Sequence, residues 1–333
     1  MQFYQSPFWL PGGHLQTIWG ARCSTSRLPQ THAPQFVRER WDTPDGDFID
    51  VDFAGLDSTN PPTSGLVLFH GLEGDSSSAY SQAFAALTQA RGWALAIVHF
   101  RGCSGEINRA PRAYHSGDFE EIDWIVQHLK TRMPTPLYAV GISLGGNALL
   151  RWAQERGTSA SADVAGIAAV CSPLDLMVSG RALELGFNRW VYTRMFLQTM
   201  KRKARLKWQQ FPGLFNLEAT QKAKTLAEFD NVFTAPLHGF KDTADYWQRA
   251  SAKPHLKKLQ IPALVLNAQN DPFVPAHSLP HSHEVSSCVT LWQPAQGGHV
   301  GFPVAQGRGL GSHVLAMPGA VLDWFSQWRP SHG

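Results

Sequence analysis

Short runs of apolar residues recur along the chain and are separated by stretches in which apolar positions have helical spacing. A strand that is covered on both faces of a parallel sheet has this pattern, because neither of its faces meets water. The runs predict six such strands, at 66–69, 94–100, 137–140, 164–170, 263–266 and 289–292.

Residues 36–53 have a two-residue period instead. The segments FVRERW and FIDVDF flank the turn sequence TPDGD, and apolar positions alternate with aspartates in the second segment. This alternation predicts an antiparallel hairpin. With the six buried strands it makes an eight-stranded, mostly parallel sheet with helices on both faces, which is an α/β fold.

Two helices can be placed from their own signals. Asp118, with Glu121 three residues later, predicts a helix start that is a variant of the capping box, and prolines at 134 and 136 follow its end. The buried face of this helix is predicted to be Ile122, Ile125, Val126 and Leu129. A last helix is predicted to have Val321, Trp324, Phe325 and Trp328 on one face.

Helical stretches, but no strand pattern, occupy the chain between about Leu174 and Pro262. Because structureless loops of this length are rare in compact domains, we predict that residues 174–262 are a helical cap inserted into a single domain of residues 1–333. A basic run from Arg189 to Lys207 lies within the cap. We expect it to be the solvated face of the cap rather than a peripheral membrane-binding surface.

The composition is typical of one large globular unit. The chain has 333 residues, 43% of them hydrophobic and 17% charged, which excludes a disordered or coiled-coil protein. Twelve Trp and nineteen Phe indicate a wide apolar pocket or surface. The net charge is only +3 and both signs are interspersed, so no nucleic-acid partner is expected.

The cysteines and the N-terminus indicate the cellular compartment. The four cysteines have no C-x-x-C spacing, which argues against a disulfide framework or a structural zinc site. The apolar N-terminus has no basic region and is broken by Pro and Gly, so it predicts neither a signal peptide nor a membrane span. We therefore expect a cytoplasmic protein; the sequence does not indicate its oligomeric state.

The segment Gly141-Ile142-Ser143-Leu144-Gly145 is a G-x-S-x-G motif between a predicted strand and a predicted helix. In this context the motif is a nucleophile elbow, a tight turn that presents the serine and leaves little room for side chains beside it. The alternative is an ordinary tight turn with an uninvolved serine. We predict that Ser143 is a nucleophile.

A serine nucleophile needs a base and a group that orients the base. In the expected chain order, Asp271 follows the strand ALVL and His299 follows the strand VTLW. Asp271 could instead cap a turn before Pro272, and His313 is a rival base. The histidines at 277, 281 and 283 are expected to lie in a solvated loop rather than to bind a metal.

The oxyanion that forms on the substrate needs two preorganised N–H donors. We predict the backbone N–H groups of Leu144, directly after the nucleophile, and Leu72, in the loop HGLEG after an earlier strand. His70 at the start of that loop is expected to hold the loop by a hydrogen bond.

The motifs resemble those of the YheT-like branch of the α/β-hydrolase superfamily, esterases related to eukaryotic abhydrolase-domain lipases and yeast alcohol acyltransferases. The resemblance implies an α/β-hydrolase fold and a triad of Ser143, Asp271 and His299. It also implies that FRGCSGE shapes the site beside the elbow. The matching segments are HLQT (14–17), HGLEG (70–74), FRGCSGE (100–106), YHSGD (114–118), GISLGGNALLRW (141–152), TAPLHGF (234–240), NDPFVP (270–275) and GGHVGF (297–302).

These residues predict a serine carboxylic-ester hydrolase that forms an acyl-enzyme on a small-molecule or lipid ester with an apolar acyl group. The chemistry requires no metal and no organic cofactor. Two alternatives stay open. The same triad could transfer the acyl group to an alcohol, or the chain could be a non-catalytic lipid- or partner-binding module on a hydrolase scaffold.

Overall fold

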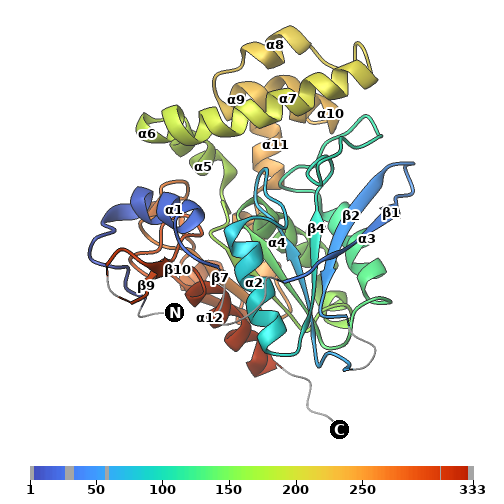
Figure 1. Cartoon of the computed structure of the whole chain (residues 1–333). Coiled ribbons are helices and arrows are strands. Elements are labelled where there is room, and N and C mark those ends of the chain that lie inside the picture. The colour runs from blue at the N-terminus through green and yellow to red at the C-terminus, as the bar shows by residue number, and fades with distance from the viewer. Residues whose placement is uncertain (1–3, 27–33, 57–59, 308, 329–333) are drawn as a thin grey trace.

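An eight-stranded sheet forms the centre of the protein (Figure 1). The computed structural model describes residues 4–26, 34–56, 60–307 and 309–328. The strand order is β1-β2-β4-β3-β5-β6-β7-β8; β1 pairs antiparallel with β2, β2 antiparallel with β4, and the other pairs are parallel. The predicted sheet is therefore confirmed. Its strands are β1 (Val37–Asp42), β2 (Phe48–Ala54), β3 (Gly65–Phe69), β4 (Ala94–His99), β5 (Leu137–Ile142), β6 (Gly166–Val170), β7 (Ala263–Leu266) and β8 (Val289–Trp292).

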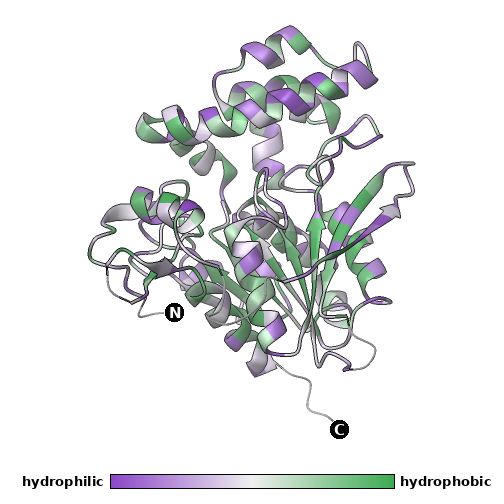
Figure 2. Ribbon diagram, viewed as in Figure 1, coloured by the Kyte–Doolittle hydropathy of each residue, from purple (hydrophilic) through white to green (hydrophobic). Residues whose placement is uncertain are grey.

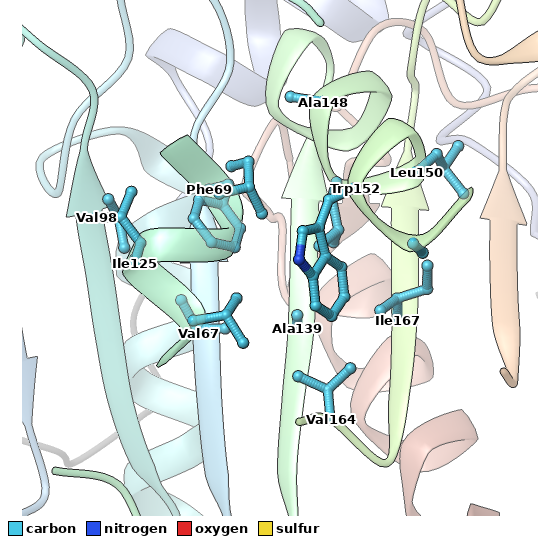
Figure 3. Packing of buried hydrophobic residues seen from close by; sticks show 14 of the residues in the cluster. Val67, Phe69, Val98, Ile125, Ala139, Ala148, Leu150, Trp152, Val164 and Ile167 are labelled. Carbon is cyan, nitrogen blue, oxygen red and sulfur yellow. The ribbon is translucent and has the colours of Figure 1, made fainter. Parts of the chain in front are cut away.

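Helices cover both faces of the sheet because its central strands are apolar on both sides. Helices α3 (Phe119–Leu129) and α4 (Leu144–Arg156) pack on one face, where Trp152 lies among Val67, Ala139 and Ile167 (Figure 3). Helices α2 (Ala79–Ala90) and α12 (Ala316–Phe325) pack on the other face. Figure 2 shows the strands as the most hydrophobic part of the molecule.

A helical layer lies above the sheet (Figure 1), and we use this name for residues 176–250. The structure describes all of residues 174–262, and no strand is present among them. The longest helix of the layer is continuous from α6 through the π-helical turn η2 into α7. The elements are α5 (Leu176–Leu183), α6 (Gly186–Asn188), η2 (Arg189–Thr193), α7 (Arg194–Gln210), α8 (Leu217–Lys222), α9 (Leu226–Phe229), η3 (Asp230–Thr234), α10 (Ala235–Leu237) and α11 (Thr243–Ala250).

Short elements complete the fold. An N-terminal helix that we did not predict, α1 (Gly12–Arg22), lies close to the two-residue strands β9 (Val304–Ala305) and β10 (Ser312–His313) (Figure 1). None of the helices among the described residues combines the length and the apolar character needed to cross a membrane. The single 3₁₀ turns are η1 (Gly157–Ala162), η4 (Lys253–Lys258), η5 (Ala276–Ser278), η6 (Ser282–Glu284) and η7 (Ser326–Trp328).

Two local predictions were wrong. Helix α3 begins after Asp118 as expected, but the Asp118 side chain makes no capping bond and pairs with Arg112, while Glu121 accepts from Arg101. Both carboxylates are buried. A buried carboxylate needs a charged partner, and losing that partner would cost more than a helix cap contributes. Trp328 lies beyond the end of α12 and is 41% exposed, so it is not part of that helix face.

The basic run is also not wholly solvated. Lys207 is buried, and its ammonium group donates to the carbonyl oxygens of Asn108 (2.6 Å) and Ala110 (2.8 Å). The Lys203 ammonium group donates to Glu73 at 2.8 Å. Both lysines lie on the side of α7 that faces the sheet, whereas the exposed members of the run are Arg189, Arg194, Arg202 and Arg205.

Candidate active site

Ser143 lies in the turn between β5 and α4, in a conformation that the surrounding backbone enforces. Its φ is +52° and its ψ is −117°, outside the common regions for an L-residue. A Cβ on Gly141 would lie 2.5 Å from the carbonyl oxygen of Gly145. A Cβ on Gly145 would lie 2.4 Å from the carbonyl oxygen of Phe69. The glycines on both sides are therefore needed for this turn to form beside β3.

The structure brings together the three residues predicted to act with each other. His299 Nε2 lies 3.0 Å from Ser143 Oγ, and His299 Nδ1 lies 2.8 Å from Asp271 Oδ2. Asp271 and His299 come from the loops after β7 and β8, 28 residues apart in sequence. With these contacts, the proton on Nδ1 can be hydrogen-bonded to the carboxylate, and Nε2 is free to accept the proton of the serine hydroxyl.

Asp271 is 4% exposed, and its second oxygen is also used. Oδ1 accepts hydrogen bonds from the backbone N–H groups of Phe273 (2.8 Å) and Val274 (3.3 Å). The ring of Phe273 in turn lies 4.2 Å from the imidazole of His299, centroid to centroid. Capping a turn was the alternative role considered for Asp271. The carboxylate fills this role through Oδ1 and contacts His299 through Oδ2.

The rival histidines are elsewhere. His313 is in β10, where its Nδ1 accepts from the backbone N–H of Leu315 at 3.3 Å. His277, His281 and His283 are exposed, as expected for a solvated loop.

The loop after β3 reaches the nucleophile. A Cβ on Gly71 would lie 3.2 Å from Ser143 Cβ, and Leu72 and Leu144 line the same cavity as Ser143. His70 holds this loop as predicted, with Nδ1 2.7 Å from the Gly71 carbonyl oxygen and Nε2 accepting from the Phe100 N–H at 3.1 Å. Burial lowers the pKa of His70 to about 3, so the ring is neutral and can accept this bond.

A network of polar side chains holds Glu73, the residue after Leu72 in this loop. Glu73 has φ +58°, its backbone N–H donates to Tyr114 Oη at 3.0 Å, and the Tyr114 hydroxyl donates to Glu73 Oε1 at 2.8 Å. Lys203 of α7 donates to the same oxygen and lies 3.1 Å from Cys103 Sγ. Burial raises the pKa of the Cys103 thiol to about 11, which makes it a poor candidate for oxidation.

A cavity of about 1150 Å³, counted to its open mouth, connects Ser143 and His299 with the helical layer. Most of its wall is apolar, and the helical layer contributes residues from α5, α7, α9, η3 and α11. Representative wall residues are Leu183, Phe196, Met200, Leu226, Phe229 and Phe233. Such a space can take a hydrocarbon chain beside the serine.

Cys171, Asp271 and His299 bring three potential metal-ligand atoms within 4.8 Å of one another, the one such grouping among the described residues. A cysteine binds a metal ion as the thiolate. Burial raises the pKa of the Cys171 thiol well above its usual value, which disfavours the thiolate. Cys171 Sγ accepts from the Val300 N–H at 3.2 Å, and the other two residues bond each other. We interpret the cysteine as support for the His299 loop.

Sequence reasoning assigned no role to two polar residues of α1. Gln16 and Thr17 contact the loops that carry Asp271 and His299. The segment HLQT was noted as a motif, and the helix around it was not predicted. The burial of Gln16 is visible only in the structure, so the sequence offered no signal for this role beyond the HLQT segment itself.

Comparison with known proteins adds independent information. A family model described as the alpha/beta hydrolase fold matches residues 66–306. The chain is 37% identical to YheT of Escherichia coli (strain K12), which is named as an esterase, over 87% of this chain and 84% of that protein. It is 30% identical to the phospholipase ABHD3 of Mus musculus, over 93% of this chain and 74% of that protein.

A solved structure with the same fold is the alpha/beta hydrolase domain-containing protein 10 from mouse. It matches with a TM-score of 0.53 and 14% identity, over 87% of this chain and 99% of that one. At this identity the likeness shows the fold alone.

Proposed function

The chain belongs to the α/β-hydrolase fold family, and on that premise we propose that it is a serine carboxylic-ester hydrolase. The observation that carries the proposal is the continuous hydrogen-bonded series from Asp271 through His299 to Ser143 Oγ. Its position beside a largely apolar cavity supports an ester with an apolar acyl group as substrate. The esterase and phospholipase names of the relatives agree with this class.

The proposed reaction begins with attack of Ser143 Oγ on the acyl carbonyl while His299 Nε2 takes the hydroxyl proton. Asp271 holds the imidazole so that Nδ1–H points at the carboxylate, and it stabilises the imidazolium. His299 then protonates the leaving alcohol. A water activated by the same histidine attacks the acyl-enzyme, and the acid leaves as Ser143 recovers its proton.

The negative charge on the tetrahedral intermediate is proposed to be stabilised by the backbone N–H groups of Leu72 and Leu144. Ser143 directly precedes the first turn of α4, a helix of 13 residues. The N-terminal end of the helix dipole therefore adds to the two donors. The cap role proposed for residues 174–262 is to cover this site, and it is supported by the helical layer's share of the cavity wall.

Labelling with a fluorophosphonate probe tests the proposal without knowledge of the natural ester. Wild-type protein should be labelled and should hydrolyse p-nitrophenyl esters, whereas Ser143→Ala should lose labelling and at least about 10³-fold in kcat/KM. Ser159→Ala, at an exposed serine, is the matched control and should behave as wild type. Labelling that persists in Ser143→Ala, or folded wild-type protein that neither labels nor hydrolyses esters, would reject the function.

A further inference from the structure

Helix α1 contains polar residues that are too deeply buried to serve solubility. Gln16 is 0% exposed and Thr17 is 8% exposed. The helix also precedes residues 66–306, the part of the chain that the family model matches. Burial of amide and hydroxyl groups costs free energy unless they are hydrogen-bonded. The positions of their partners therefore indicate what the helix does.

The Gln16 side chain joins both loops that carry the acid and the base. Its Oε1 accepts from Asn270 Nδ2 and from the backbone N–H of Gly297, each at 2.9 Å. Asn270 directly precedes Asp271, and Gly297 lies two residues before His299. Asn270 Oδ1 also accepts from the Gly298 N–H at 3.0 Å, which links the two loops to each other.

The Thr17 side chain bonds the proposed base residue itself. Its Oγ1 accepts from the backbone N–H of His299 at 2.8 Å, and the hydroxyl donates to the Gly13 carbonyl oxygen at 2.7 Å. The hydroxyl proton is thereby directed into the helix, and the oxygen lone pair is left for His299.

The loop needs this support because its backbone is strained directly after His299. Val300, a β-branched residue, has φ +60°, whereas Gly298 adopts its φ of +62° without strain. Conformations of this kind persist only where the surroundings enforce them. Without a partner for its N–H, His299 would be free to follow the loop toward a relaxed conformation.

Helix and loops approach each other closely at two glycines. A Cβ on Gly13 would lie 1.8 Å from the Asn270 carbonyl oxygen. A Cβ on Gly298 would lie 2.7 Å from both the Gly13 carbonyl oxygen and Thr17 Oγ1. At these two positions the backbone of α1 directly contacts the loops, which fixes where the side chains of Gln16 and Thr17 lie.

We propose that Gln16 and Thr17 are positioning residues that hold Asp271 and His299 in the arrangement needed to activate Ser143. This inference rests on the proposed ester hydrolysis. Each acts through the two loops, Thr17 and Gln16 through backbone N–H groups and Gln16 also through the side chain of Asn270. The helix would then complete the catalytic geometry from outside residues 66–306.

The test compares Thr17→Val, which keeps the shape of the side chain but removes the acceptor, with Thr17→Ser, which keeps the hydroxyl. Thr17→Val should lower kcat on a short-chain p-nitrophenyl ester by about 10- to 100-fold with little change in KM, because the base is displaced and not the acyl site. Thr17→Ser should recover most of the rate. Leu15→Ala, an exposed position of α1, should change kcat by less than about 2-fold.

Gln16→Met is a second variant, expected to act in the same direction, in case Thr17→Val fails to fold. Wild-type kcat in either folded variant would overturn the proposal. So would equal losses in Thr17→Val and Leu15→Ala, which would indicate general damage to the helix.

A measurement without turnover separates this proposal from the proposed function. An imidazole N–H bonded to a carboxylate gives a far-downfield proton NMR resonance, assigned here by its loss in Asp271→Asn. The resonance should shift or broaden in Thr17→Val and return in Thr17→Ser. An unchanged resonance in Thr17→Val would overturn the positioning role even in an active esterase. A wild type that hydrolyses no ester would reject the function, while the same spectra would still report whether Thr17 controls the His299–Asp271 contact.

Discussion

The sheet and the helical layer meet beside Ser143, but different forces place them there. In the sheet, the strands around the nucleophile are buried and apolar, and the turn is set by contacts between backbones at Gly141 and Gly145. The layer has its own apolar cluster, which includes Phe273 of the loop after β7. Unlike the sheet, it also contacts the loops below through charged groups, the ammonium groups of Lys203 and Lys207. It also encloses Asp230 in the cavity wall.

This difference has a consequence for how each region responds to its surroundings. Close packing is insensitive to pH and depends steeply on side-chain volume. Buried charges tolerate changes of shape better but depend on their partners and on protonation. We therefore expect substitutions in the sheet to act through volume, and substitutions in the layer to act through charge.

The largest effect is expected at the sheet. Gly145→Ala would place a methyl group 2.4 Å from the Phe69 carbonyl oxygen, so β3 or the elbow must move. We expect a loss of about 3 kcal/mol in the free energy of unfolding and a fall of about 10²-fold or more in kcat/KM. Urea unfolding and ester hydrolysis measure the two quantities. A fully active, equally stable Gly145→Ala would show that the elbow is not sterically determined.

A smaller effect is expected where the layer contacts the loop of Leu72. Lys203→Met removes the ammonium partner of Glu73, so the loop that carries one proposed oxyanion donor loses a support. We expect kcat/KM to fall about 10-fold. Lys203→Arg should retain more of the activity because it keeps the charge. The control is Arg202→Ala, which removes a charge at an exposed position beside Lys203 on α7. An equally large loss of kcat/KM in Arg202→Ala would mean that the overall charge of α7 matters, and not the bond between Lys203 and Glu73.

The smallest effect concerns Asp230, whose pKa is raised to about 6 by burial. Thr234 Oγ1 and Trp247 Nε1 donate to different oxygens of this carboxylate, Oδ1 and Oδ2. In Asn the amide oxygen can keep the bond from Trp247, and the amide N–H can donate to the Thr234 hydroxyl oxygen, as the O–H of a protonated Asp230 would. Because the folded state holds this proton more tightly than the unfolded state, the contribution of Asp230 to stability is present below about pH 4 and is lost as pH rises through about 6.

Asp230→Asn should therefore be more stable than wild type at pH 8, by about 1 kcal/mol, and the difference should vanish below about pH 4. Thermal unfolding of both proteins across this range measures it. A stability difference that is independent of pH would show that Asp230 does not titrate in this window, and that the layer is less sensitive to charge than the comparison suggests.

The predictable parts of the molecule are those with local causes. Six strands of the main sheet could be placed from apolar runs because burial on both faces excludes polar residues from consecutive positions. The other two, β1 and β2, could be placed from their two-residue period. Ser143 could be selected because an elbow needs glycines at fixed offsets, and Asp271 and His299 because the fold dictates their loops. Their roles as a triad stay a prediction that the experiments above address.

The failures had non-local causes. Asp118 and Glu121 had the spacing of a capping box, but arginines outside the helix bind them, Arg112 six residues from Asp118 and Arg101 twenty residues from Glu121. The sequence could not indicate that Lys203 and Lys207 point inward. A run of basic residues has the same sequence pattern whether its ammonium groups contact water or, as here, a carboxylate and backbone carbonyls. Helix α1 was missed because its glycines and polar residues give no amphipathic pattern; they serve contacts with loops about 250 residues away.

By itself the sequence determined the order of the main-sheet strands along the chain, the elbow, and which residue types follow which strands, since these depend on periodicity and on short-range sterics. Only the tertiary structure decided which side chains meet. That His299 reaches Ser143 across 156 residues, and that Gln16 and Thr17 brace the loops on which it depends, follows from packing between distant segments. Hydrogen bonds of this kind are selected by three-dimensional proximity, which no local pattern encodes.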